Sequence, residues 1–152
     1  MNYRWITSPD RQLFHELLLL GDEDDRMLQR YTNAGELLAA FNGDQSVGVA
    51  LFVTVSPETV ELKNLAVAPA FQRQGIGKHL MTLGLQHYAG EFQQMLVGTG
   101  DRDVENLRFY QHLGFVQSGV RENFFKQYAE PIIVDGQPLK DMILLTQAVP
   151  VR

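Results

Sequence analysis

The chain has 152 residues, of which 45% are hydrophobic and 20% are charged, which suits a single globular domain spanning residues 1–152. Its net charge of -5 and the lack of a basic run argue against a nucleic acid partner, because phosphate binding depends on clustered Lys and Arg. The absence of cysteine excludes disulfides, thiol catalysis and zinc–cysteine sites, and the 4 histidines lack metal-ligand spacing, so no metal is expected.

The N-terminal region has no charged-then-apolar signal pattern. Its longest apolar run, residues 17–20, is far shorter than the roughly 20 residues of a membrane span. We therefore expect a protein of the cytoplasm that does not enter a membrane, and the lack of cysteine fits that reducing compartment.

Two helices are predicted near the N-terminus. Ser8 can cap a helix that starts at Pro9, along which apolar residues recur at helical spacing, and Gly21 is a suitable stop. The segment DEDDRMLQRYTNAG, residues 22–35, follows as a short second helix, with acidic residues in the first turn, where the helix dipole favours them.

Strands and further helices come next. The segment 36–55 contains two apolar runs joined by a tight-turn signal at Asn42 and Gly43, and a third strand follows SPET. The remaining elements are a helix over 75–88, a buried strand in QQMLVGTG, a helix over 104–113 that Gly114 ends, and two strands that flank an aromatic segment, with a turn at Asp135 and Gly136. This order predicts a mixed α/β fold.

The third strand, in TVELKNLAVAP, changes phase part-way along. Val60 and Leu62 share one face, but Leu65 and Val67 have the opposite phase, so a regular strand cannot bury both pairs on one side. One extra residue at 63–64 restores the inward direction, which predicts a β-bulge. The alternative is a strand that is covered on both faces.

The segment QRQGIG, residues 72–77, joins this strand to the next helix. Because a glycine costs up to about 1 kcal/mol relative to alanine inside a helix, Gly75 and Gly77 need a reason. A helix start presents unpaired N–H groups and a positive dipole end, and glycines admit an anion to them, which favours a phosphate site. The segment fits neither the Walker A nor the dinucleotide-binding pattern. A tight strand-to-helix connection is the alternative without a ligand.

The segment LAVAPAFQRQGIGKHLM, residues 65–81, resembles the acetyl-CoA signature of the GNAT superfamily of N-acetyltransferases. In that signature Gln or Arg, two residues, Gly, one residue, and Gly or Ala follow a bulged strand, matched here by Gln72, Gly75 and Gly77. A second family element, a helix that ends in Tyr, three residues, Gly and Phe, is matched by Tyr110, Gly114 and Phe115. The resemblance covers about residues 36–121.

The resemblance implies acetyl-CoA as the acyl donor. It also implies a GNAT-like fold, in which helices flank a central, bulged, mostly antiparallel sheet with one splayed parallel strand pair. Backbone groups of one strand segment should pair with the pantetheine arm: Leu65, Ala66 and Val67. The amides of the loop and helix start should hold the pyrophosphate, with help from Gln72: Arg73, Gln74, Gly75, Ile76, Gly77 and Lys78.

Acetyl transfer to an amine requires a neutral nitrogen, although an amine like that of lysine has a pKa of about 10.4. A base or a water wire must therefore assist. Glu61 lies six residues before Val67, the offset at which some members of the superfamily carry a strand glutamate as base, so the resemblance makes it the first candidate. A solvated strand residue between Val60 and Leu62 is the alternative.

The departing thiolate requires a proton or a strong hydrogen bond, which a phenol near the sulfur can supply. Tyr110 matches the family's position for this role. Without the motif, it is an ordinary core aromatic on the helix face shared with Leu107 and Leu113.

One position departs from the family pattern. Seven residues before the tyrosine the family often has an asparagine that touches the cofactor, whereas this chain has Asp103. A carboxylate beside a pyrophosphate is unfavourable, so we interpret Asp103 as a helix N-cap and Asn106 as a substitute contact.

The segment RENFFKQYAEP, residues 121–131, can contribute to an acceptor pocket. Phe124, Phe125 and Tyr128 are candidate walls, and Glu122 or Glu130 can face a cationic amine. The alternative is simple packing of the aromatic rings against the sheet.

The leading hypothesis is an acetyl-CoA-dependent N-acetyltransferase that moves an acetyl group directly to a primary amine of a small molecule or peptide. A non-catalytic acyl-CoA-binding regulatory module is the alternative, suggested by Asp103 and by the unsettled base. A third hypothesis is an oligomer, such as a homodimer, built through an exposed edge of the final strands. The motifs give no information on the acceptor, which contacts the N-terminal helices and the final strands.

Overall fold

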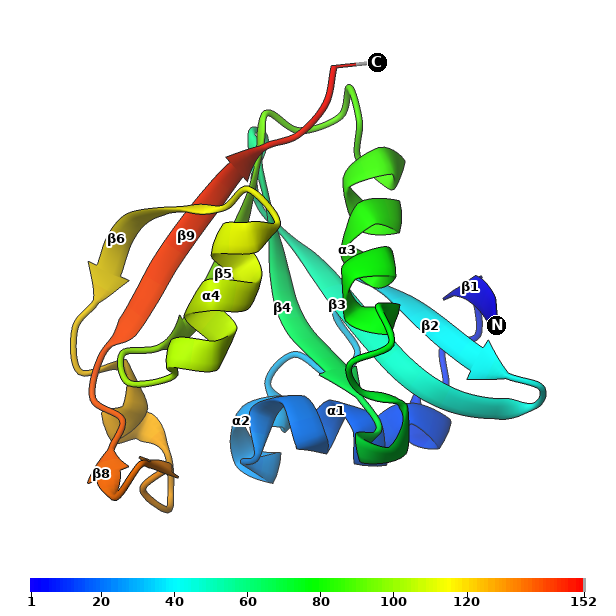
Figure 1. The fold of residues 1–152 in the computed structure, drawn as a ribbon. Helices are drawn as coiled ribbons and strands as arrows, with labels where there is room; N and C mark the ends of the chain where they lie inside the picture. The colour runs from blue at the N-terminus through cyan, green and yellow to red at the C-terminus, as the bar shows by residue number, and fades with distance from the viewer. Residues whose placement is uncertain (152) are drawn as a thin grey trace.

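A seven-stranded sheet forms the centre of the computed structural model, which describes residues 1–151 (Figure 1). The strand order is β1-β2-β3-β4-β5-β9-β6, and every neighbouring pair is antiparallel except β4–β5. The predicted mixed α/β class, with one parallel pair in a mostly antiparallel sheet, is confirmed. The strands are β1 (Asn2–Ile6), β2 (Glu36–Asn42), β3 (Gln45–Ser56), β4 (Thr59–Val67), β5 (Gln94–Gly100), β6 (Val116–Arg121) and β9 (Met142–Ala148), with a separate hairpin of β7 (Ile133–Val134) and β8 (Gln137–Pro138).

Helices cover both faces of the sheet and create two hydrophobic cores. α3 and α4 pack around the larger core, in which Phe52 and Phe115 are fully buried. α1 and α2 pack around the second core, which contains Leu18 and Leu51. The helices are α1 (His15–Asp22), α2 (Asp25–Gln29), α3 (Ile76–His87) and α4 (Val104–His112), with 3-10 turns η1 (Gln12–Phe14), η2 (Pro69–Phe71) and η3 (Phe124–Gln127).

Residues Asn2–Ile6 form strand β1, where the sequence predicted no strand. β1 pairs with β2 at one edge of the sheet. The rings of Tyr3 and Trp5 lie 4.4 and 4.0 Å from the rings of His79 and His87 on α3. The aromatic residues alternate along the strand, which is the sequence signal for a half-buried strand.

The first helix begins later than predicted. Ser8 and Pro9 precede it, and the helical course starts with η1 and continues as α1 from His15 to Asp22, one residue past the predicted stop at Gly21. A tertiary contact explains the late start, because the guanidinium of Arg11 donates hydrogen bonds to three carbonyl oxygens in the turn before β2: those of Thr32, Ala34 and Gly35. The short second helix, α2, is confirmed, with Asp24 as its N-cap.

The predicted bulge in β4 is confirmed. Leu51 of β3 pairs with Asn64, whereas Phe52 pairs with Leu62, so Lys63 is the extra residue. The bulge keeps one set of apolar side chains on the face of the larger core: Val60, Leu62, Leu65 and Val67. The opposite face of β4 is covered by α1, so the alternative of burial on both faces holds as well.

β4 and β5 pair along only part of their length. Residues 59–62 lie in parallel register with residues 94–97, and the pairing ends there. Residues 64–67 of β4 remain paired with β3, but their edge toward β5 has no paired strand within residues 1–151. The two strands therefore diverge from the bulge onward (Figure 1).

The predicted turns and the final pair of strands are also confirmed. Gly43 has a φ of 63° between β2 and β3, and Gly114 has a φ of 98° directly after α4. Asp135 and Gly136 connect β7 to β8, and both have positive φ. The two strands predicted around the aromatic segment are β6 and β9, which pair with each other. Within residues 1–151, no helix is long and apolar enough to cross a membrane.

Candidate functional site

Six consecutive backbone N–H groups at the start of α3, those of residues 73–78, have no hydrogen-bond acceptor among residues 1–151. The first bond of this helix runs from the amide of His79 to the carbonyl oxygen of Gly75, at 3.0 Å. The N-terminus of a helix also carries the positive end of the helix dipole. Unpaired donors and this dipole together form a site for an anion.

The backbone conformation at position 75 explains why a glycine is needed there. Its φ is 84°, a left-handed value that strains a residue with a side chain, although a Cβ would meet nothing within 4 Å. A Cβ on Gly77, in contrast, would make ordinary contacts with Phe109 at 3.4 Å and Val67 at 3.8 Å. The turn itself therefore requires Gly75, which is compatible with both interpretations of the glycines, the anion site and the tight connection.

A cavity of about 600 Å³ is bounded by the end of β4, the glycine loop, the start of α4 and the end of α1. We call it the larger cavity. Of the residues predicted to bind the cofactor, only Gln74 does not line it, because its side chain donates to the carbonyl oxygen of Ala70 instead, at 3.4 Å. The predicted residues that do line it are Leu65, Ala66, Val67, Gln72, Arg73, Gly75, Ile76, Gly77, Lys78 and Asn106, together with Tyr110.

Two polar side chains of the larger cavity make hydrogen bonds within the protein. Nε2 of Gln72 donates to the carbonyl oxygen of Val67 at 2.9 Å, which braces the loop against β4. Nδ2 of Asn106 donates to the Asp103 carboxylate at 2.8 Å, and the same carboxylate accepts the backbone amide of Asn106 at 3.2 Å. The interpretation of Asp103 as the N-cap of α4 is therefore confirmed.

Tyr110 on α4 is 7% exposed and lines the larger cavity. Its ring packs edge-on against Phe115, with centroids 5.7 Å apart, and no residue within 1–151 makes a hydrogen bond with its hydroxyl. Burial, and secondarily the charge of Asp103, raise the pKa of Tyr110 above its ordinary value of 10.0. The phenol is therefore protonated at neutral pH. This is compatible with both interpretations of Tyr110, a core aromatic and a proton donor in the cavity.

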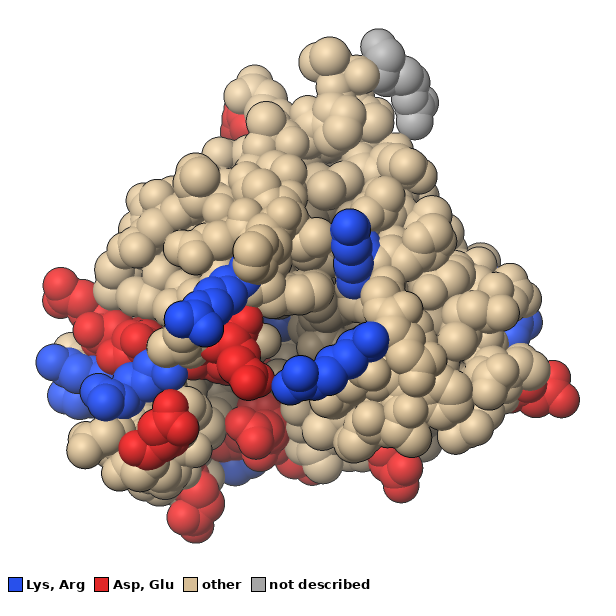
Figure 2. All heavy atoms as spheres, in the orientation of Figure 1, with Lys and Arg blue, Asp and Glu red and all other residues tan. Residues whose placement is uncertain are grey.

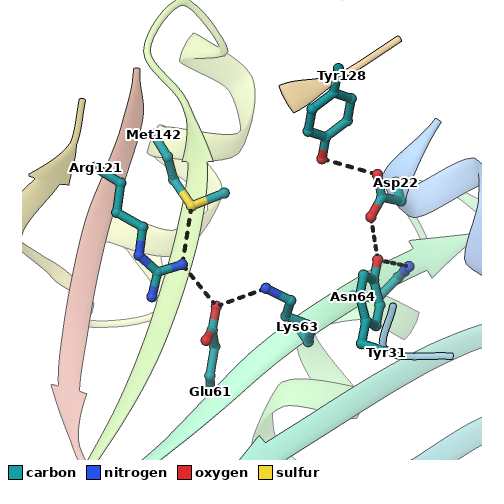
Figure 3. Close-up of polar contacts among 8 residues, drawn as sticks. All are labelled: Asp22, Tyr31, Glu61, Lys63, Asn64, Arg121, Tyr128 and Met142. Carbon is teal, nitrogen blue, oxygen red and sulfur yellow. Dashed lines mark hydrogen bonds and ion pairs between the residues drawn. The ribbon is translucent and has the colours of Figure 1, made fainter. Parts of the chain in front are cut away.

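Glu61 lines a different cavity, of about 350 Å³, which we call the smaller cavity. Its side chain is only 7% exposed, so Glu61 is not a solvated strand residue. Nζ of Lys63 and a guanidinium nitrogen of Arg121 lie 4.0 and 3.8 Å from its Oε2 (Figure 3). These are ion pairs too long for hydrogen bonds, and in the described part of the chain no donor makes a hydrogen bond with this carboxylate.

The two cavities adjoin at the β4 bulge. Residues 61–63 line the smaller cavity and residues 65–67 line the larger one. Between them stands Asn64, which is 4% exposed and whose Nδ2 donates to the carbonyl oxygen of Leu18. Glu61 and Tyr110, the two predicted catalytic residues, therefore belong to separate cavities on either side of the bulge.

Asp22, at the end of α1, is a wall residue of the smaller cavity that was not predicted. Its Oδ1 accepts a hydrogen bond from the Tyr128 hydroxyl at 3.0 Å, and its Oδ2 accepts one from the Tyr31 hydroxyl (Figure 3). Burial first, and then the adjacent Asp22 carboxylate, raise the pKa of both tyrosines. Both hydroxyls therefore remain proton donors to Asp22.

Asp22 stands out only once its position at the end of α1 is known. A negative charge in the last turn of a helix opposes the helix dipole, so an aspartate there requires another explanation. The sequence pattern places the whole run DEDD at the start of the second helix, but only Asp24 and Asp25 lie there, as N-cap and first residue of α2.

The aromatic segment contributes part of the predicted pocket. Phe124 and Tyr128 line the smaller cavity, whereas Phe125 does not and packs with its ring centroid 5.1 Å from that of Phe124. Glu122 lines none of the three cavities. Glu130 lines a third cavity, of about 560 Å³, which shares Tyr128 with the smaller cavity and has three further carboxylates: Glu23, Asp24 and Asp25.

Charge is distributed unevenly over the face of the molecule that Figure 2 shows. Figure 2 shows basic side chains on both sides of a hollow in the middle of the face, with acidic side chains gathered to its left and below. Arg73 and Lys78 border the larger cavity. Within residues 1–151, positive charge for a phosphate therefore comes from Arg73 and Lys78 alone, because the other charged residues of the larger cavity are carboxylates: Glu23, Asp103 and Glu105. The third cavity has four carboxylates and one Arg, an excess of negative charge that favours the approach of cations.

Three comparisons with known proteins bear on this site. Residues 33–117 match a family described as an acetyltransferase (GNAT) domain. The chain is 32% identical over 133 residues to the uncharacterized N-acetyltransferase YvbK of Bacillus subtilis strain 168, and the match covers 86% of each chain. It is similar to a GNAT family acetyltransferase from Elizabethkingia anophelis with acetyl-CoA bound, with a TM-score of 0.86 and 34% identity over 97% of this chain and 98% of that one. It is also similar to a Bacillus subtilis acetyltransferase in complex with CoA, with a TM-score of 0.85 and 29% identity over 96% and 97% of the two chains.

Proposed function

The chain belongs to the GNAT acetyltransferases, with acetyl-CoA as acyl donor, and we propose that it moves the acetyl group directly to a primary amine of a small molecule or peptide. One observation carries the proposal: the backbone N–H groups of residues 73–78 lack an acceptor within residues 1–151 at the start of a 12-residue helix. A pyrophosphate is the kind of group that such a row of donors binds.

The proposed position of acetyl-CoA follows from the residues at the two ends of the larger cavity. The pyrophosphate lies on the amides of residues 73–78, beside Arg73 and Lys78. The pantetheine arm runs along the unpaired edge of residues 65–67, where β4 and β5 have diverged. The arm would place the thioester near the bulge, where the larger cavity adjoins the smaller one. Asn106 is a further proposed contact.

The proposed chemistry uses one group from each cavity. The bound ammonium loses one proton to Glu61, directly or through water, and the proton passes on to solvent. The neutral nitrogen then attacks the thioester carbonyl carbon, so that a C–N bond forms and the C–S bond breaks. Tyr110 gives its proton to the departing thiolate and recovers one from the second proton that the new amide nitrogen releases.

The raised pKa of Tyr110 means that the phenol is protonated and can donate a hydrogen bond when the thiolate departs, although it also makes the phenol a weaker acid. The burial of Glu61 beside Lys63 and Arg121 supports its assignment as the base, since it places a carboxylate with no hydrogen-bond donor among residues 1–151 on the wall of the smaller cavity.

The alternative, a non-catalytic acyl-CoA-binding module, is favoured by Asp103 in place of the family's asparagine. The test is CoA release from acetyl-CoA with a panel of primary amines, for wild type and Tyr110→Phe. An N-acetyltransferase that uses Tyr110 should lose roughly 100-fold in kcat in the folded variant. Acetyl-CoA binding without CoA release by any amine would leave the binding module as the function.

A homodimer formed through β6 and a cytoplasmic location are further parts of the proposal. β6 is an edge strand of the sheet, and Val116 and Val120 on it are 65% and 44% exposed. Such an edge can pair with a second copy. Size-exclusion chromatography with light scattering measures the mass of the protein and so tests whether it is a dimer.

A further inference from the structure

The smaller cavity contains a second carboxylate that the proposed chemistry does not use. Glu61 stands on the β4 wall, and Asp22 stands on the α1 wall (Figure 3). This inference rests on the proposed function. We propose that the acceptor is a diamine: its reacting nitrogen faces Glu61, and Asp22 binds its second, positively charged nitrogen. Asp22 is then a specificity-determining residue for the reaction.

The charge of Asp22 has no cation paired with it. Both of its oxygens accept hydrogen bonds from tyrosine hydroxyls, which are neutral donors. Among residues 1–151, no Lys, Arg or His nitrogen lies within the 4.0 Å of an ion pair with this carboxylate. A carboxylate that is held in place by neutral donors, and that faces a cavity, is suited to bind a cation from outside the protein.

The cations that line the same cavity have other partners. A guanidinium nitrogen of Arg30 donates to Oε1 of Gln127 at 2.9 Å. Nζ of Lys63 lies 4.0 Å from Glu61 and 5.4 Å from the centre of the Tyr31 ring. The two carboxylates of the cavity therefore differ: Glu61 is flanked by Lys63 and Arg121, whereas Asp22 keeps its charge for a ligand.

The position of Asp22 on its helix is unfavourable for a negative charge. Asp22 is the last residue of α1, where the helix dipole is negative and disfavours an anion. A neutral asparagine would accept the two tyrosine hydrogen bonds less well through its single oxygen, but it would avoid that repulsion. A positively charged ligand would explain why a carboxylate occupies this position.

The rest of the cavity suits the carbon chain of a diamine. Tyr31 and Tyr128 line the cavity, and their hydroxyls contact Asp22, so their rings form part of its wall near that carboxylate. Phe124 and Met142 add apolar surface that can cover methylene groups. The neighbouring third cavity, with its four carboxylates, favours the approach of a dication over that of an anion.

The buried state of Glu61 is an independent observation that points to a ligand. Its side chain is only 7% exposed and lines the cavity, and although Lys63 and Arg121 lie at ion-pair distance, no donor in the described part of the chain makes a hydrogen bond with it. An amine nitrogen would supply the missing donor. A diamine therefore satisfies the carboxylates on both walls at once.

The test compares three acceptors of equal chain length: putrescine, butylamine and γ-aminobutyrate. Their binding to the protein–CoA complex is measured by calorimetry, and their kcat/KM by CoA release. We expect putrescine to exceed butylamine by at least about tenfold in both quantities, because only putrescine places an ammonium at Asp22. Asp22→Asn should lower that preference by at least about tenfold.

Two variants control for charge and for architecture. Asp44→Asn removes the same charge from an exposed residue in the turn between β2 and β3, which lines none of the three cavities, and should leave the preference unchanged. Tyr128→Phe removes one hydrogen bond from Asp22 but keeps its charge, so the preference for putrescine should persist. A loss in Asp44→Asn equal to that in Asp22→Asn would overturn the proposal.

Failure of this inference and failure of the proposed function give different results. If butylamine or γ-aminobutyrate binds and reacts as well as putrescine, the acetyltransferase stands and the role of Asp22 is overturned. If putrescine binds in an Asp22-dependent way but no amine releases CoA, the diamine site stands and the proposed catalysis falls. Binding of γ-aminobutyrate above putrescine would assign the site to Lys63 and Arg121 instead.

Discussion

The side-chain amide of Asn64 donates a 2.8 Å hydrogen bond to the carbonyl oxygen of Leu18, 46 residues earlier in the chain. This bond joins the bulge in β4 to α1. A Cβ on Gly21 would lie only 2.0 Å from Oδ1 of Asn64, so the helix and the strand approach closely at this point. Because residues on either side of Asn64 line the two cavities, this contact sets the position of the wall between them.

Asn64→Ala should lower the free energy of unfolding by about 1–3 kcal/mol, because the carbonyl of Leu18 loses its donor in a buried place. Urea unfolding measures the loss. The matched control is Asn42→Ala at the exposed end of β2, which should change stability by no more than about 0.5 kcal/mol. Equal effects of the two variants would contradict the role of Asn64.

Alanine should destabilise the protein at one glycine of α3 and not at another. A Cβ on Gly84 would lie 2.4 Å from the ring of Phe52, so Gly84→Ala should destabilise the protein by about 1–3 kcal/mol. A Cβ on Gly77 meets only ordinary contacts, so Gly77→Ala should be neutral or gain up to about 1 kcal/mol from helix propensity. Thermal unfolding of both variants checks this, and a shift of the same sign in both would contradict it.

The part of the fold that could be predicted from the sequence is the part that local physics determines. The phase change between Leu62 and Leu65 requires an extra residue, and Lys63 is that residue. Gly114 and the Asp135–Gly136 turn have the positive φ values that such residues adopt. The two motifs that carry the family resemblance, the glycine loop and the helix with Tyr110, lie 30 or more positions apart yet line one cavity, as the resemblance implies.

The part that could not be predicted depends on contacts between distant segments. Arg11 binds carbonyl groups more than 20 residues away, which delays the first helix although Ser8 and Pro9 favour an earlier start. Asp22 and Tyr128 are 106 residues apart, and no local pattern links them. The walls of the smaller cavity come from such contacts, which explains why the acceptor site was the least predictable part of the molecule.

Alkaline pH should unfold the protein rather than titrate its tyrosines one by one. All 5 tyrosines have a pKa above the ordinary value of 10.0, burial being the largest cause for each. The unfolded chain releases these protons near pH 10 while the folded chain keeps them, so stability is complete below about pH 10 and falls above it. Tyrosinate absorbance should therefore rise together with the loss of far-ultraviolet circular dichroism. A tyrosinate titration with a midpoint near pH 10 in the folded protein would contradict this.

Glu61→Gln should separate a base from a structural ion-pair partner. If Glu61 takes the proton of the amine, kcat should fall by roughly 100-fold at neutral pH and recover as the pH approaches the pKa of the free amine, which is about 10. The measurement is a pH profile of kcat between pH 6 and 9.5, as far as stability allows. A uniform loss at every pH would show that Glu61 serves only to hold Lys63 and Arg121.

The account depends most on the anion site at residues 73–78, and acetyl-CoA binding to Gly75→Glu tests it most directly. Gly43→Glu is the matched control, because both glycines have positive φ, 84° and 63°, and both would place a Cβ in open space. With acetyl-CoA at about 100 times its dissociation constant, linkage stabilises the wild type by about 2.7 kcal/mol, which is a rise of several degrees in the melting temperature. We expect that rise in wild type and Gly43→Glu, and its loss in folded Gly75→Glu. An equal rise in all three proteins would contradict a pyrophosphate site at the start of α3.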